Sequence, residues 1–183
     1  MSSELATTVA PPLAQTLLRS DGSPTTIGPL SLPLVPDAGR YEFQRILGVG
    51  GMGEVRLSID RRVGREVAFK IARRRDARPA GDRFVREALL QARLEHPSFV
   101  PVYDVGTDPD GEVFFTMRRI RGETLHDILH PTDATGAARF GRGRLLGAFA
   151  QLCLAVDYAH SRGVVHRDLK PANVMLGDFG EVY

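Results

Sequence analysis

A polar segment near the C-terminal end of the chain, residues 166–173, holds three side chains that can do chemistry together. Asp168 can accept a proton from a hydroxyl group. Lys170 can neutralise developing negative charge, and Asn173 offers an amide oxygen to a divalent cation. A base, a cation and a metal ligand are the groups that phosphoryl transfer needs once its reactants are positioned. A polar loop without such a role would rarely carry all three, so we interpret this segment as a phosphoryl-transfer loop.

A second informative residue is Lys70, which ends the apolar segment 67–70. The chain has 24 basic residues, and only Lys70 and Lys170 are lysines. Strand alternation would put Ala68 and Lys70 on one face, and a compact ammonium group reaches a phosphate where a planar guanidinium is bulkier. Glu87 is the expected ion-pair partner of Lys70. A solvated surface charge remains the alternative for each of these two residues.

A glycine-rich segment supplies a third candidate site, because closely spaced glycines let backbone N–H groups approach phosphate oxygens. A tight hairpin or a dinucleotide-binding fold would also contain such glycines. A dinucleotide fingerprint opens a helix, whereas residues 54–59 alternate as a strand, which favours a phosphate-covering hairpin. The segment reads Gly48, Val49, Gly50, Gly51, Met52, Gly53, Glu54, Val55.

The elements that must position these residues follow from hydrophobic periodicity. A helix is predicted over 83–94, between the third and fourth of five strands, and His96-Pro97 stops it. The predicted strands are 41–47, 54–59, 66–71, 100–105 and 113–117. A later helix, ending at Gly163, has one predicted apolar face with the spacing i, i+4, i+7, i+11 and i+14. That face consists of Leu145, Phe149, Leu152, Val156 and Ala159.

The composition is that of a globular protein: 183 residues, 43% hydrophobic, 25% charged, with a net charge of +2. These proportions exclude a collagen, a coiled coil and a wholly disordered chain. Residues 1–40 hold six of the 12 prolines and few charges, so we expect a disordered tail. The single cysteine, Cys153, is expected to be buried and inert. Neither a secretory signal nor a membrane segment is predicted, and the expected location is the cytoplasm.

Taken together, the three motifs resemble those of the eukaryotic-like (Hanks-type) protein kinases. They occur in the family's order, as a GxGxxGxV loop, a VAIK-like strand and the string HRDLKPxN. Lys170, two residues after the aspartate, corresponds to the serine/threonine class. The sequence of the glycine-rich segment most resembles that of bacterial members. The resemblance covers residues 41–183.

The resemblance implies an α+β, protein-kinase-like fold. We expect an ATP-binding N-lobe over 41–121, with a five-stranded antiparallel sheet and one helix. The beginning of a mainly helical, incomplete C-lobe would follow over 122–183.

The resemblance also implies roles for the site residues. Lys70, paired with Glu87, would hold the α- and β-phosphates of ATP, and the glycine-rich loop would cover them. Asp168 would be the catalytic base, Lys170 would contact the γ-phosphate, and Asn173 would bind Mg²⁺. Apolar residues would enclose the adenine, with Met117 as gatekeeper and residues 118–120 as hinge. The cofactor-binding residues are thus Leu47, Gly48, Val49, Gly50, Gly51, Met52, Gly53, Val55, Ala68, Lys70, Met117, Ile120 and Met175.

The triplet Asp178-Phe179-Gly180 spells the family's magnesium-binding motif at the wrong distance. Only four residues separate it from Asn173, whereas a hairpin intervenes in the family. We therefore interpret residues 177–180 as the turn of that hairpin. This interpretation predicts a kinase truncated before the true motif, with Asn173 alone holding Mg²⁺ poorly and an exposed apolar face on the helix 145–159.

Three functions follow from these patterns. The first is a serine/threonine protein kinase that uses ATP and Mg²⁺ to phosphorylate protein hydroxyls, with no nucleic-acid partner. The second is a non-catalytic nucleotide-binding or interaction fragment of such a kinase. The third, a dinucleotide-binding oxidoreductase, is disfavoured by the strand after Gly53 and by the HRDLKPAN string.

Overall fold

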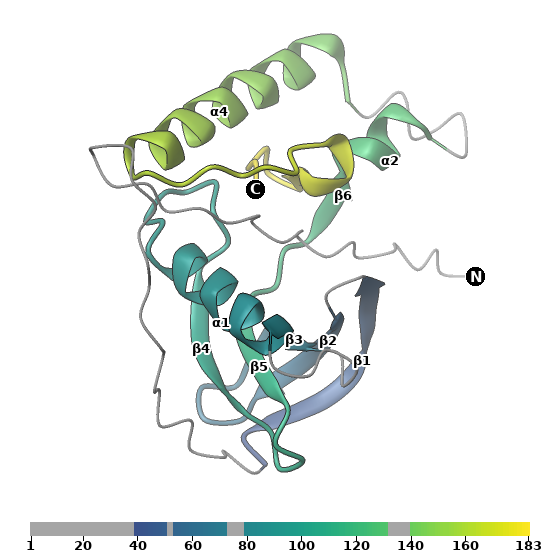
Figure 1. Ribbon diagram of the computed structural model, residues 1–183. Coiled ribbons are helices and arrows are strands. Elements are labelled where there is room, and N and C mark those ends of the chain that lie inside the picture. The colour runs from purple at the N-terminus through teal and green to yellow at the C-terminus, as the bar shows by residue number, and fades with distance from the viewer. Residues whose placement is uncertain (1–38, 51–52, 73–78, 132–139) are drawn as a thin grey trace, which may run out of the picture.

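The computed structural model describes residues 39–50, 53–72, 79–131 and 140–183. A five-stranded sheet with helix α1 forms one part of the molecule. A second part, with the long helix α4 at its outer side, lies above it in Figure 1. The predicted tail falls almost entirely outside the described residues.

The sheet is antiparallel throughout and has the order β1-β2-β3-β5-β4. The prediction of five strands is confirmed, with ends that differ by up to three residues. Strand β3 is central, and its burial on both faces explains its apolar sequence. The strands are β1 (Tyr41–Gly50), β2 (Gly53–Asp60), β3 (Arg65–Ala72), β4 (Val102–Thr107) and β5 (Val113–Arg118).

Helix α1 (Pro79–Ala92) packs on the sheet beside β4 and β5. The predicted helix began at residue 83, so the actual helix starts four residues earlier. Phe84 and Ala88, spaced one turn apart, are both buried, and the ring of Phe84 lies 5.1 Å from that of Phe115 between centroids. This packing fixes the helix against the sheet and thereby positions Glu87.

The second part begins with a short strand, β6 (Gly122–Thr124), which pairs with β7 (Met175–Gly177). Helix α2 (Leu125–Leu129) follows β6, and Thr124 caps it by accepting a hydrogen bond of 3.1 Å from the Asp127 N–H. A single 3₁₀ turn, η1 (Pro171–Asn173), precedes β7. These elements are too short for periodicity to predict. Strand β7 was expected, as residues 174–176, only because it forms the first strand of the predicted hairpin, and the other three elements were not predicted.

Helix α4 (Arg142–Ser161) contains the predicted helix, and Gly163 follows its end with a φ of 72°. Its predicted apolar face is wrong in part. The buried residues are Ala148, Ala155 and Ala159, whereas Phe149 is 61% exposed. The inward face of the helix is lined largely by alanines, with Leu145 and Leu152 partly buried beside them, and the Phe149 ring faces solvent.

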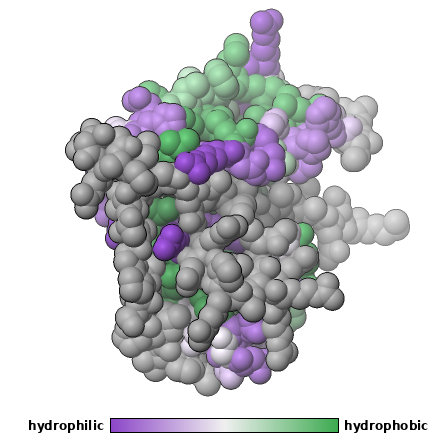
Figure 2. Space-filling view, in the orientation of Figure 1, coloured by the Kyte–Doolittle hydropathy of each residue, from purple (hydrophilic) through white to green (hydrophobic). Residues whose placement is uncertain are grey.

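Two further sequence expectations concern the outer face of α4. Cys153 was predicted to be buried and is exposed, because it lies away from the alanine-lined face. Of the apolar face that was expected to be exposed, only Phe149 is, because Leu145, Leu152 and Val156 are half-buried and Ala159 is buried. Leu146 and Leu154, outside that face, are also exposed, and green surface lies over α4 in Figure 2. Across the described ranges, no helix has the length and apolar character needed to cross a membrane.

Candidate active site

The Nζ atom of Lys70 lies 2.6 Å from Oε1 of Glu87, joining β3 to α1. Both side chains are buried, and the ammonium group also lies over the ring of Phe115, 5.3 Å from its centroid. Burial raises the pKa of Glu87 above its usual range, and the nearby Lys70 charge opposes that effect. The ion pair predicted from the sequence is therefore present, in surroundings with little water to screen it.

An apolar cluster extends from Lys70 along the sheet and joins the two parts of the molecule. Met175 of β7 is fully buried in this cluster, beside residues of the sheet. Asn173 lies two residues before Met175, so the same contact ties the polar loop to the sheet. Every apolar side chain that the sequence assigned to an adenine site belongs to this cluster, namely Leu47, Val55, Ala68, Met117, Ile120 and Met175.

The glycine-rich segment forms facing ends of β1 and β2, with Gly48 opposite Val55 and Gly50 opposite Gly53. Gly53 has a φ of 151°, and a Cβ atom there would lie 2.1 Å from the Ile71 carbonyl oxygen. Only glycine fits this close approach of β2 to β3. The predicted roles of Gly51 and Met52 fall outside the described residues, and Val49 is exposed on β1.

The polar loop is closed by contacts among its three predicted catalytic residues. Lys170 Nζ lies 2.8 Å from Oδ2 of Asp168. The Asn173 amide donates to the same oxygen at 3.0 Å and to the Asp168 carbonyl oxygen at 2.6 Å. Lys170 first, and then Asn173, hold the pKa of Asp168 below its usual value, so its carboxylate is ionised at neutral pH. Arg167 adopts a φ of 59°, the positive-φ conformation that turns the chain at this point.

The Asp178-Phe179-Gly180 triplet occupies the turn of a hairpin. The backbone of Met175 bonds in both directions to that of Tyr183, at 2.8 and 2.9 Å, and Leu176 faces Val182 across an isolated bridge. Phe179 is 94% exposed, and its N–H donates to the Glu181 carboxylate at 3.1 Å. The predicted hairpin turn is therefore present.

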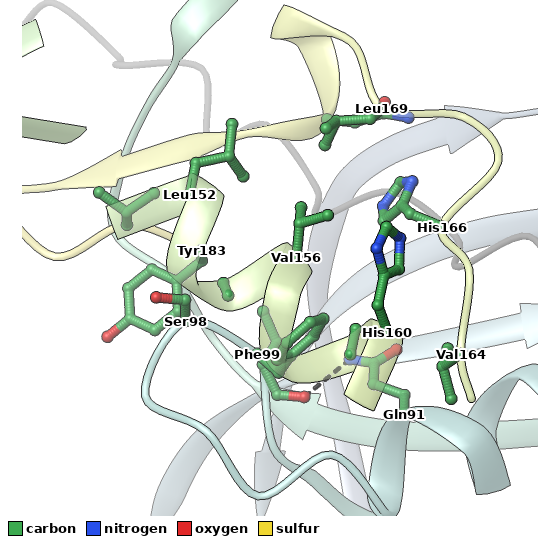
Figure 3. Close-up of a pocket in the computed structure, with 15 residues that line it drawn as sticks. Gln91, Ser98, Phe99, Leu152, Val156, His160, Val164, His166, Leu169 and Tyr183 are labelled. Carbon is green, nitrogen blue, oxygen red and sulfur yellow. Dashed lines mark hydrogen bonds between the residues drawn. The ribbon is translucent and has the colours of Figure 1, made fainter. Parts of the chain in front are cut away.

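A cavity of about 60 Å³ lies behind the polar loop, between α4 and the segment that follows α1. Its walls are mainly apolar, with Leu152, Val156 and Phe99 among them, and His166 and Leu169 lie at its edge (Figure 3). The side-chain amide of Gln91 donates to the Val100 carbonyl oxygen at 2.7 Å in its wall. The cavity was not predicted, because its lining comes from segments without a shared motif.

Sequence reasoning also missed contacts around the proposed hinge. Arg118 Nη1 lies 3.3 Å from the Tyr183 hydroxyl, which links the end of β5 to the hairpin. Arg119 and Arg121 both contact Glu66 at the start of β3. The sequence did contain a signal for these contacts, because three of the four residues 118–121 are arginines. That signal indicates an acidic partner but does not identify it.

Oxygen atoms suited to Mg²⁺ are present in the polar loop, because Asp168 and Asn173 are adjacent and Mg²⁺ prefers carboxylate and amide oxygens. Within the described ranges, no group of three or more His, Cys, Asp or Glu residues could hold a metal ion. Mg²⁺ commonly takes one or two protein ligands and completes its shell with phosphate oxygens and water. The donor set therefore fits a metal that binds together with a phosphorylated ligand.

Comparison with known proteins gives one consistent result. Residues 41–182 match the protein kinase domain family. The serine/threonine-protein kinase PknD of Chlamydia felis is 42% identical over 153 residues, and PknD of Chlamydia trachomatis serovar D is 41% identical over 156 residues. The solved kinase domain of M. tuberculosis PknI is 32% identical, with a TM-score of 0.59.

Each match covers most of this chain but a smaller share of the related protein. Each match covers 78% of this chain. The chain spans 16% of the length of the PknD relatives and 59% of the PknI kinase domain.

Proposed function

The chain belongs to the protein kinase domain family, and on that premise we propose that it carries the nucleotide site and catalytic loop of a serine/threonine protein kinase. The reaction is transfer of the ATP γ-phosphoryl group to a serine or threonine hydroxyl of a protein substrate. Members of this family use ATP and typically Mg²⁺, and the cytoplasm is the expected location.

The observation that carries this proposal is the ionised Asp168 carboxylate held between Lys170 and Asn173 in one loop. A carboxylate with a lowered pKa stays deprotonated at neutral pH, so it can orient a substrate hydroxyl and accept its proton. The adjacent ammonium group of Lys170 would offset negative charge on the transferred group.

The residues of the sheet would hold the nucleotide. The cluster around Ala68, Met117 and Met175 offers apolar surfaces for a purine ring, and Lys70 supplies a cation for the α- and β-phosphates. Glu87 would hold the Lys70 ammonium in place from α1. Bound ATP supplies the transferable phosphoryl group, and Mg²⁺ held by Asn173 would neutralise its charge.

A second candidate function is nucleotide binding without catalysis. It is favoured by the small number of oxygen donors in the polar loop, where Asp168 and Asn173 lie side by side. Weak metal binding would slow phosphoryl transfer more than it would weaken nucleotide binding, because the apolar cluster and Lys70 do not depend on the metal.

A phosphoryl-transfer assay with γ-³²P-ATP and a basic protein substrate separates the two functions. We expect transfer by the 183-residue chain, at least a 100-fold loss in Asp168→Asn, and retention in Asp178→Ala. Nucleotide binding without transfer would favour the second function. Loss of activity in Asp178→Ala would contradict the assignment of residues 177–180 as a simple turn.

A further inference from the structure

A three-residue connector, residues 119–121, joins the sheet to the second part of the molecule (Figure 1). The antiparallel ladder between β3 and β5 ends at the pair Val67 and Arg118. Strand β6 begins at Gly122 and pairs with β7, away from the sheet. The connector therefore has no ladder hydrogen bonds with either sheet, although it lies where a kinase hinge contacts adenine.

Beyond the end of this ladder, the Glu66 side chain attaches the connector to β3. Glu66 directly precedes Val67 in the sequence. Its Oε2 atom accepts hydrogen bonds from Nη1 of Arg119 and from Nη2 of Arg121, the second at 2.8 Å. The two arginines flank Ile120, which is buried in the apolar cluster. One oxygen atom thus holds the connector from both sides of the residue that faces the nucleotide site.

The charges at this contact depend on one another. Hydrogen bonds from Arg121 and Arg119 hold the pKa of Glu66 below its usual range, so the carboxylate is ionised at neutral pH. The Arg119 side chain is only 15% exposed, and its Nε atom is buried without a hydrogen-bond partner among the described residues. If Glu66 were replaced by an uncharged residue, the Arg119 guanidinium would stay largely buried and would lose the negative charge that Glu66 now provides.

The position of Glu66 on β3 relates the connector to the rest of the site. Strand alternation puts Glu66, Ala68 and Lys70 on one face, in steps of about 7 Å. The same strand face therefore carries, in sequence, the connector contact, a wall of the apolar cluster and the phosphate-binding lysine. A shift of the connector relative to β3 would move adenine relative to Lys70.

We propose that Glu66 is a positioning residue, which fixes the connector against β3 and thereby sets where adenine binds relative to Lys70. This role rests on the proposed function, because it presumes that the connector binds adenine. The contact itself does not require a nucleotide to be present.

The test compares Glu66→Gln with Glu42→Gln in the 183-residue chain. Glu42 is a matched control because its carboxylate also pairs with an arginine, Arg61, at 3.0 Å on the same sheet. That pair is far more exposed and has no contact with the connector. Calorimetric titration with adenosine and with ATP measures affinity, and hydrogen–deuterium exchange of the nucleotide-free chain measures protection of residues 119–122.

In Glu66→Gln we expect affinity to fall about fivefold to tenfold, by the same factor for adenosine and ATP, because the phosphate contacts are unchanged. Exchange at residues 119–122 should become faster, while Glu42→Gln matches the parent chain in both measurements. Replacing both Glu66 and Arg119 by glutamine should cost no more affinity than Glu66→Gln alone, because the unpaired guanidinium is then also removed.

Unchanged adenosine affinity in Glu66→Gln would overturn the positioning role and leave the proposed function intact. A loss confined to ATP would also overturn it, since that result would place the effect at the phosphates. If the parent chain bound neither ligand, the proposed function would fail instead. The exchange measurement would then still decide whether Glu66 holds the connector.

Discussion

Lys70 and Glu87 form an ion pair of 2.6 Å in which the two side chains are only 6% and 2% exposed. Such a pair is asymmetric in its energetics. The attraction between the charges roughly offsets the cost of removing them from water, so an apolar pair of similar size can be as stable. Removing one partner, in contrast, leaves the other charge buried and uncompensated.

We therefore predict that Lys70→Met lowers the free energy of unfolding by about 3 kcal/mol. The double variant Lys70→Met with Glu87→Met should recover most of that loss, because no charge remains buried. Urea unfolding monitored by circular dichroism measures both values. Equal losses in the single and double variants would show that packing, and not the unpaired carboxylate, determines the effect.

The close approach of β2 to β3 at Gly53 gives a second prediction. Gly53→Ala would put a Cβ atom against the Ile71 carbonyl oxygen and force a φ that alanine avoids. We expect a loss of about 2 kcal/mol or more in unfolding free energy. Gly50→Ala is the control, because a Cβ atom at Gly50 meets nothing within 4 Å. Similar thermal midpoints for the two variants would contradict the contact.

The acid sensitivity of the sheet is predicted from Asp60, which is buried and accepts two hydrogen bonds of 3.0 Å from Arg40. These bonds lower the pKa of Asp60 in the folded chain. The stabilisation is therefore complete above the unfolded value of about 3.9 and is lost as the pH falls through the lower folded value.

Asp60→Asn should accordingly be less stable than the parent chain at pH 7, and the difference should shrink as the pH falls below about 4. Thermal unfolding between pH 7 and pH 2 measures this dependence, with the exposed Asp110→Asn as control. A difference that stayed constant over the whole range would exclude the Arg40 contact as its cause.

The polar loop gives a fourth prediction, which does not depend on activity. Because Lys170 is the main cause of the lowered Asp168 pKa, Lys170→Gln should raise that pKa towards the ordinary aspartate value. Titration followed by ¹³C NMR of the aspartate carboxyl groups measures the change, with Asp168→Asn to assign the signal. An unchanged midpoint would mean that Lys170 does not stay beside Asp168 in solution.

The sequence allowed much of the site to be predicted, because its elements have strong local signals. Alternation identified the strands that carry Val55, Ala68 and Met117, and all three lie in one apolar cluster. The hairpin was predicted because only four residues separate Asn173 from Asp178, whereas the kinase family that the sequence resembles has a hairpin before its metal-binding triplet, and the hairpin is present. These features depend on a few adjacent residues, and distant segments have little influence on them.

Other features could not be predicted because they depend on how distant segments meet. Periodicity put Phe149 on the inner face of α4, yet the buried residues of this helix are Ala148, Ala155 and Ala159, and the Phe149 ring is exposed. The pairing of Glu66 with two connector arginines depends on where β5 leaves the sheet. The β6–β7 pair is three residues long, too short for a periodic signal.

The hairpin at residues 177–180 also bears on how short motifs are read. The triplet Asp-Phe-Gly binds a metal at its usual position in the kinase family. At residues 178–180 of this chain it forms a hairpin turn, and the Phe179 ring is exposed to solvent. The role of such a triplet depends on its distance along the chain from the polar loop, and here only four residues separate it from Asn173. In this chain the number of residues after Asn173 therefore distinguishes a hairpin turn from a metal-binding motif, whereas the identity of the three residues does not.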